Sequence, residues 1–287
     1  MTKETRTWAK EALEQEQALQ AIKARNSVAV LYFQNKTGQR ELVPLQKGMA
    51  LMLTTDLSKV RSLQVVERVR LQALVEELGL GASGMVTPES APRVGKLLQA
   101  YWLVGGDIAG EKAALQVHSD VLDVPSPKIA GQPTAEGKLA EFFALEKTLL
   151  FQIIKILGIK PTPEEEEELK KPLSTNWAAL MALFEGVDAS DEQQFDAAAG
   201  AYERALSLDP KLLLARDALN ELQSMGLVKG KKPTTSGLLK SLRNRTSVTD
   251  APSSQDDPTK RMHSKEPGSP SGSTPVDVTP IFPGLVR

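Results

Sequence analysis

A short apolar strand that runs directly into an amphipathic helix constrains the fold of this chain more than any other feature. Residues 63–66 form an apolar, β-branched run, which the charged pair Glu67 and Arg68 ends. Leucine and valine side chains, Leu74 among them, then recur three and four residues apart up to position 78. That spacing is typical of the buried face of a helix, so we expect a strand and a helix divided by this pair.

Strands and helices alternate on both sides of this unit. Residues 28–33 and 102–108 have the composition of strands, and a helix is expected from about 45 to 57. A third strand at 102–108 turns back into an antiparallel strand at 114–124, and a long apolar stripe predicts a helix over 136–157. The pattern predicts an α/β domain whose mixed sheet is layered with helices.

Three stretches of this domain, residues 27–38, 65–68 and 101–106, resemble the CsgG-type family, which is related to the N-terminal domain of TolB. The resemblance covers residues 25–160, and the order and spacing of the stretches carry it. The residues that correspond to the family pattern are Asn35, Thr37, Gly38, Glu67, Arg68, Glu77 and Gly106. From the residues themselves, we expect Glu67 and Arg68 to cap the following helix and to pair with its charged side chains.

The resemblance implies a component of cell-envelope assembly, located in the periplasm or at the periplasmic face of the outer membrane. It also implies a homo-oligomer that forms through the α/β domain and an N-terminal helix at 1–24. Pore-forming members of the family carry a longer loop after the first strand and membrane-spanning hairpins inserted farther along. Neither insertion is present here, because the connection after Phe33 is short and residues 108–135 lack a lipid-facing pattern.

The N-terminal residues predict a helix that packs on its own domain, or, as the resemblance implies, on a neighbouring subunit. No secretory signal is expected in residues 1–26, because charged side chains interrupt every apolar run, and no segment is long enough to span a bilayer. A cytoplasmic protein, a misassigned start and a mature form all fit this observation. The absence of cysteine excludes disulfides and thiolate metal sites.

A second region, residues 161–224, begins with an acidic linker and continues as three helical patterns. Gly186, Phe195, Ala198, Tyr202, Ala205 and Pro210 follow the spacing of a tetratricopeptide repeat. A single repeat buries little apolar surface, so we expect this small all-α module to dock on the α/β domain or on a protein partner. Trp177, Phe195 and Tyr202 are the candidate partner-binding residues, with Phe195 and Tyr202 central to the packing of the module.

Residues 225–287 are rich in Pro, Ser, Thr and Gly, which predicts a disordered tail. Ten Lys or Arg residues against five Asp or Glu residues make this tail basic. A solubilising linker and a segment that contacts an anionic membrane surface or an acidic partner are the two interpretations.

We find no pattern that predicts catalysis, a cofactor or a metal site. Residues 79–84 formally match G-x-G-x-x-G, but they follow a helix, whereas a dinucleotide-binding loop follows a strand. Gly79 is better explained as the left-handed residue that ends a helix, and Gly106 as a place where a helix backbone packs closely on a strand. A net charge of −1 gives no general attraction to nucleic acid.

Two functions therefore remain. The first is a non-enzymatic assembly or scaffold protein of the cell envelope that binds protein partners and lacks pore-forming segments. The second is a cytoplasmic regulatory or adaptor module built on the same domain.

Overall fold

The computed structural model describes residues 3–19, 21–22, 24–79, 86–87 and 89–228. Within these ranges the chain has a mixed sheet of six strands flanked by α-helices, which confirms the predicted α/β class. None of the helices in this part of the chain combines the length and apolar character required to cross a bilayer. The predicted tail lies outside the described residues from position 229 onward.

The first strand, β1, occupies an interior position of the sheet and is buried over most of its length. It pairs in parallel with β2 on one side and β3 on the other, while β3 pairs antiparallel with β4. Two short strands, β5 and β6, both pair antiparallel with β4. The bounds are β1 Ser27–Asn35, β2 Gln64–Val65, β3 Trp102–Glu111, β4 Ala114–Asp123, β5 Lys128–Gly131 and β6 Thr134–Gly137.

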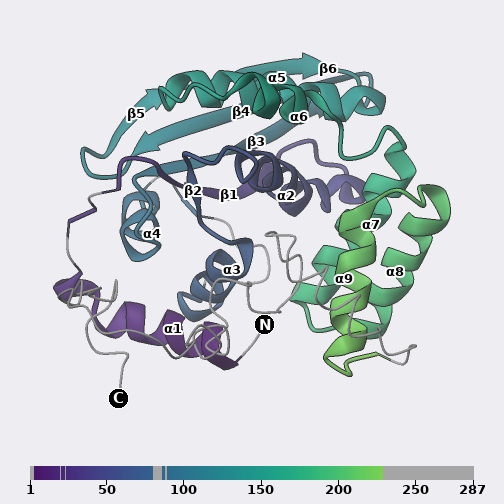
Figure 1. Ribbon diagram of the computed structural model, residues 1–287, viewed down its shortest axis with the longest axis horizontal. Helices are drawn as coiled ribbons and strands as arrows, with labels where there is room; N and C mark the ends of the chain where they lie inside the picture. Colours follow the sequence, from purple (N-terminus) through teal and green to yellow (C-terminus); the bar gives the residue numbers. More distant parts are fainter. Residues whose placement is uncertain (1–2, 20, 23, 80–85, 88, 229–287) are drawn as a thin grey trace, which may run out of the picture. The chain divides into compact units, whose positions relative to one another are not determined.

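Helices cover both faces of the sheet (Figure 1). β2 lies on one side of β1 and β3 on the other. The connection through α2 therefore crosses the sheet in one direction, and the connection through α3 and α4 crosses it in the opposite direction. Right-handed crossovers therefore place α2 on one face and α3 with α4 on the other. α5 packs on α2 and on β4, β5 and β6, while α1 packs on α3. The bounds are α1 Lys3–Glu14, α2 Leu45–Leu57, α3 Arg68–Glu77, α4 Ala91–Leu97 and α5 Phe142–Ile156.

α2 is buried on nearly all sides, because it lies against β1, α5 and α7. Its apolar residues pack against these elements, and Gly48 lets the backbone of α2 lie close to α7. A Cβ atom at Gly48 would lie 2.4 Å from the ring of Phe184 in α7. The glycine therefore sets how closely the C-terminal helices approach the α/β domain.

The last described helices are α7 Trp177–Asp191, α8 Phe195–Leu208 and α9 Leu213–Ser224, which we call the helical module. α8 packs on both α7 and α9. The ring of Tyr202 in α8 fills the space that Gly186 in α7 leaves open, and a Cβ there would lie 2.4 Å from the ring. Ala198 and Ala205 are fully buried on the same helix, so small side chains bring the two backbones together.

The structure differs from the sequence-based expectation at three places. β5 and β6 are not predicted, and β6 includes Glu136, which was expected to begin the long helix; that helix starts at Phe142 after a 3-10 turn. The N-terminal helix ends at Glu14. The acidic run forms a helix of its own, α6 Pro163–Lys170, because Thr162 and Glu165 make a capping box at its start.

We expect the substitution Leu74→Ala to lower the free energy of unfolding by about 2–5 kcal/mol, the usual range for truncating a buried leucine. Leu74 is fully buried in α3, within the main core. Urea unfolding of the full chain measures this change. The exposed neighbour Glu77 is the matched control, and Glu77→Ala should change the free energy by less than about 0.5 kcal/mol. Equal effects of both substitutions would contradict the burial of Leu74.

The substitution Gly48→Ala should destabilise the protein by about 1–3 kcal/mol, because the new methyl group overlaps the Phe184 ring. Gly200 in α8 has no atom within 4 Å of its missing Cβ, so Gly200→Ala should stabilise the helix by about 0.5–1 kcal/mol. Thermal melting of both variants gives the comparison. A stabilised Gly48→Ala variant would show that α2 and α7 do not pack as described.

Candidate functional site

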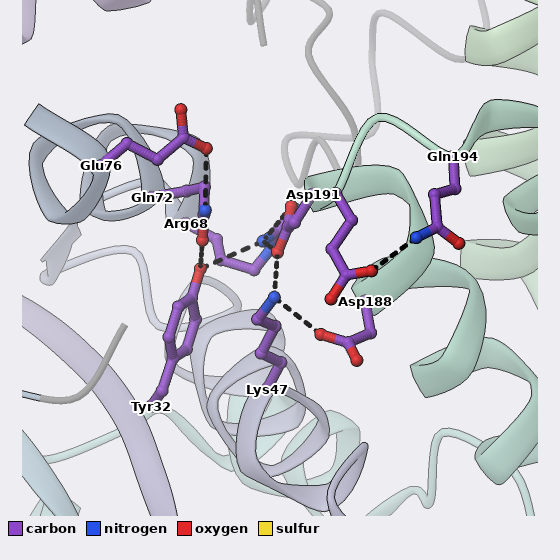
Figure 2. A network of polar contacts seen from close by, with 9 residues as sticks. Tyr32, Lys47, Arg68, Gln72, Glu76, Asp188, Asp191 and Gln194 are labelled. Carbon is purple, nitrogen blue, oxygen red and sulfur yellow. Dashed lines mark hydrogen bonds and ion pairs between the residues drawn. The ribbon is translucent and has the colours of Figure 1, made fainter. Parts of the chain in front are cut away.

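Charged and polar side chains from four elements meet where the helical module packs on the α/β domain (Figure 2). Tyr32 comes from the second half of β1, Lys47 from the first turn of α2, and Arg68 from the first residue of α3. Asp188 and Asp191 come from the last turns of α7. β1 and β2 are parallel, so the helices that follow them begin at the same edge of the sheet, which brings Lys47 and Arg68 together.

Arg68 and Asp191 form the centre of this joint. The Nη1 atom of Arg68 donates to Oδ1 of Asp191 at 2.9 Å and to Oδ2 at 2.7 Å, and also donates to the Tyr32 hydroxyl at 3.2 Å. The Nζ atom of Lys47 lies 3.2 Å from Asp191 Oδ2 and 2.7 Å from Asp188 Oδ1. Two cations of the α/β domain thus face two carboxylates of the module, and their formal charges balance.

Hydrogen bonds extend the joint along α3. The Tyr32 hydroxyl donates to Oε1 of Gln72 at 2.8 Å, and Nε2 of Gln72 donates to Glu76 at 2.9 Å. The ammonium of Lys47 lies over the Tyr32 ring, 5.7 Å from its centroid. The tyrosine therefore contacts the cations of both α2 and α3, and it fixes where the two helices begin relative to β1.

Burial makes these interactions strong and fixes the charges. The side chain of Arg68 is 2% exposed and that of Asp191 6% exposed. Burial acts to lower the pKa of Arg68, but the charge of Asp191, the neighbouring Tyr32 and the hydrogen bonds to Asp191 together outweigh it, so the pKa lies above its ordinary value. Burial raises the pKa of Tyr32 and of Tyr202, so both phenols stay neutral. The guanidinium of Arg68 thus stays charged in the joint, and the two phenols stay neutral.

A polar cleft of about 350 Å³ opens beside the joint. Buried Lys47 and Asp191 form part of its wall, and both are already engaged in ion pairs. The exposed residues Glu76 and Glu192 line it from α3 and from the end of α7. The other lining residues are Gln72, Gly79 and Gln193.

Asn35, Thr37 and Gly38 form the turn that connects β1 to α2. Oδ1 of Asn35 accepts from the backbone N–H of Thr37 at 3.0 Å and from its hydroxyl at 2.6 Å. The amide of Asn35 donates to the carbonyl of Gln39, and Gly38 has a positive φ of 73°. The turn is therefore closed by its own side chains, and it directs the chain into the helix that carries Lys47.

Glu67 and Arg68 act differently from the expectation. Glu67 is the N-cap residue of α3, but its side chain makes no capping hydrogen bond. Arg68 binds Asp191 in α7, 123 residues away in sequence, and Tyr32 in β1. The expectation that Glu67 caps the helix with its side chain is thus wrong, and Arg68 joins its helix to β1 and α7. Glu77 lies exposed near the end of α3.

The glycine positions also differ in part from the prediction. Gly79 has a positive φ of 67° and follows α3, as expected for a helix-ending residue. At Gly106, however, the close neighbour is a strand: a Cβ atom would lie 1.9 Å from the carbonyl oxygen of His118 in β4. The idea of a helix packing on this glycine is therefore wrong, because the pleat of the β3–β4 pair itself leaves no room there.

The three candidate partner-binding residues lie in different environments. Tyr202 is fully enclosed within the module. Trp177 is half-buried and its ring packs edge-on against Phe142 of α5, with centroids 5.6 Å apart. Phe195 is half-buried at the start of α8. Of the three, Tyr202 lies close enough to Arg68 and Asp191 to interact with their charges, whereas Trp177 contacts the α/β domain.

Sequence reasoning missed Lys47, Asp188 and Asp191. A signal was present for Lys47, because Lys47 and Asp56 are the charged residues of an otherwise apolar, buried helix. Asp188 and Asp191 lie three residues apart and therefore share a helix face, but their burial depends on the neighbouring domain. Asp56 also proves to be paired, since it binds both Lys59 and Lys147.

Comparison with known proteins finds a family match for the N-terminal part of the chain. Residues 9–112 match the family described as "Curli production assembly/transport component CsgG", which confirms the resemblance to this family for that part. Among solved structures, the LpoB C-terminal domain from Salmonella enterica is 14% identical, with a TM-score of 0.32, and the alignment covers 47% of this chain and 95% of that chain. The LpoB C-terminal domain from Escherichia coli is 14% identical, with a TM-score of 0.31, and the alignment covers 45% and 96%. No curated protein sequence matches this chain.

Removing the central carboxylate should weaken the joint strongly. We expect Asp191→Ala to cost about 3–5 kcal/mol, because it leaves the guanidinium of Arg68 buried without its main partner. Replacing both Arg68 and Asp191 by leucine should cost less than Asp191→Ala alone. Urea unfolding measures all three changes, and Glu192→Ala, on the exposed next residue, is the control. A loss below about 1 kcal/mol for Asp191→Ala would contradict a buried, interdependent pair.

A second charged cluster joins α2 to α5. Glu146 in α5 is completely buried, and within the described residues neither of its carboxylate oxygens accepts a hydrogen bond. Lys147 lies 3.3 Å from Glu146 and also binds Asp56 of α2. Burial, followed by the charge of Asp56, raises the pKa of Glu146 to about 8. Glu146 is therefore protonated in the folded protein at neutral pH.

This protonation makes stability depend on pH. Between about pH 4.5 and 8 the folded chain keeps a proton that the unfolded chain releases, so stability should fall as the pH rises, by up to about 1.4 kcal/mol per unit. Glu146→Gln should remove this loss, whereas Glu141→Gln, on an exposed residue, should retain it. Urea unfolding of the three proteins at pH 5, 6, 7 and 8 gives the free energy of unfolding of each as a function of pH. Parallel curves for wild type and Glu146→Gln would contradict the assignment.

Proposed function

We propose that this chain is a non-enzymatic scaffold protein of the bacterial cell envelope. A CsgG-type α/β domain over residues 25–160 holds a tetratricopeptide-like module within residues 161–224, and the module binds a protein partner. One observation carries the proposal: the joint of Arg68, Lys47 and Asp191 fixes one side of the module on the α/β domain. The outer helices α8 and α9 are then presented to a partner at a fixed orientation.

The geometry of the module supports this assignment. The close contact of Gly186 with Tyr202, and the buried alanines of α8, follow the packing that the repeat pattern requires. Asp209 closes the turn after α8, since its carboxylate accepts from the backbone N–H of Lys211 at 3.0 Å and from the Ser174 hydroxyl at 2.5 Å. Asp209 therefore links the turn between α8 and α9 to the segment that precedes α7.

Exposed apolar side chains mark the face that we assign to the partner. Leu208 at the end of α8 is 46% exposed, and Leu213 at the start of α9 is 56% exposed. Both lie next to the turn at Pro210, and Phe195 is half-buried at the other end of α8. The core of a protein interface is apolar, and aromatic residues such as Phe195 are enriched there.

The family match over residues 9–112 supports an envelope location, which we propose to be the periplasm or the periplasmic face of the outer membrane. Two residues alone join β3 to β4, so this connection has no room for an inserted hairpin, which supports a role without a pore. A second copy of the chain could assemble through α1 and the α/β domain. The alternative, a cytoplasmic adaptor, uses the same joint and differs in location.

Site-specific photo-crosslinking in cells tests the proposal. A benzoylphenylalanine at Leu213 should give a light-dependent adduct with another protein, found in the periplasmic or outer-membrane fraction. The same group at the exposed residue Glu136 on β6 is the control and should give no such adduct. Adducts confined to the cytoplasmic fraction would favour the adaptor, and equal labelling from both positions would contradict a partner face on the module.

A further inference from the structure

A second cleft, of about 450 Å³, is lined by the segment after α1, by helix α4 and by the turn after β4. None of its lining residues belongs to the joint. This volume is within the usual range of small-molecule sites, about 300–1,000 Å³. Most of its lining is aliphatic or proline: Ala21, Ile22, Pro92, Val124 and Pro125. The cleft can therefore remove a sizeable apolar group from water.

The floor of the cleft is closed by direct packing of α4 on the end of β4. A Cβ atom at Gly95 would lie 2.5 Å from the side chain of Val124, so the helix backbone rests on the valine. An extended apolar ligand would thus lie across the cleft, against Val124 and Pro125 on one side and the Ala21–Ile22 segment on the other.

The charged groups of the cleft gather on one wall. Arg93 and Lys96 are three residues apart in α4, so their side chains share one face of the helix. Glu16 accepts two hydrogen bonds from Arg93, at 2.8 and 2.7 Å, and the pKa of Glu16 is lowered by this contact. The charge of Lys96 also acts on Glu16, so among the residues that line the cleft two cations face one carboxylate and the wall keeps one net positive charge.

The lining also argues against a peptide ligand. A bound peptide needs donors and acceptors for its backbone, and unpaired amides are costly to bury. Pro92 and Pro125 have no N–H group, and the aliphatic residues contribute no polar side-chain atoms. An apolar chain that ends in a single anionic group matches the lining better, because it needs only one cation.

We propose that this cleft binds a fatty acid of about twelve carbons, with the carboxylate on the ammonium of Lys96 and the acyl chain along the aliphatic wall. The carboxylate balances the one net positive charge, and the chain covers the aliphatic residues. Nothing in this site involves the joint of Arg68 and Asp191 or the outer face of the module. The proposal therefore stands or falls separately from the function proposed above.

Fluorescence titration of the full chain with 11-(dansylamino)undecanoic acid tests it. We expect saturable binding, displaced by dodecanoate and far more weakly by dodecylamine, which has the same chain and the opposite charge. Lys96→Gln should weaken binding about tenfold, the loss expected for one charge-assisted contact. Lys138→Gln, which removes an exposed lysine near the opposite end of β4, should leave the affinity unchanged.

Several results would overturn the proposal. No saturable signal, equal displacement by the amine, or an unchanged affinity in Lys96→Gln would each do so. Binding to phosphatidylglycerol vesicles without binding of free dodecanoate would show a membrane surface contact instead of a fatty-acid site. Thermal melting of Lys96→Gln must match that of wild type. If this variant unfolds, the preference for dodecanoate over dodecylamine in the unmodified chain still decides the question.

Discussion

The buried ion pair of Arg68 and Asp191 is the interaction on which the arrangement of the described chain depends. A buried guanidinium without a partner costs several kcal/mol, so the first residue of α3 and the last turn of α7 must stay together. Lys47 and Tyr32 complete the same site from α2 and β1. The carboxylate of Asp191 thus joins α7 to α2 and α3, and Arg68 extends the joint to Tyr32 of β1, so the module is fixed relative to the sheet that precedes it.

Such a joint supplies specificity more than net stability, since pairing repays little beyond the cost of removing charges from water. Apolar packing supplies the rest, as where Phe184 lies against Gly48 and Trp177 against Phe142. Apolar contacts alone tolerate small sliding, whereas the bonds of Arg68 to both oxygens of Asp191 permit one register. The α/β domain thus provides an apolar surface against which α7 of the helical module is buried.

A second group of charged side chains, Asp56, Glu146 and Lys147, joins α2 to α5. Glu146 is kept neutral by burial, while Asp56 is satisfied by two lysines. The α2–α5 contact therefore loses stability as the pH rises from about 4.5 to 8, while the Arg68 guanidinium of the joint stays charged.

The sequence by itself determined strands β1 to β4, helices α2, α3 and α5 and their order in the α/β domain, because periodic burial of apolar residues is a local pattern. It also determined the helix end at Gly79, where the left-handed conformation favours glycine. It did not determine β5 and β6, which are four residues long and take their pairing from β4. Nor did it determine the partner of Arg68. Asp191 lies 123 residues farther along the chain, and only the packing of α7 on α2 brings the two charges into one buried site.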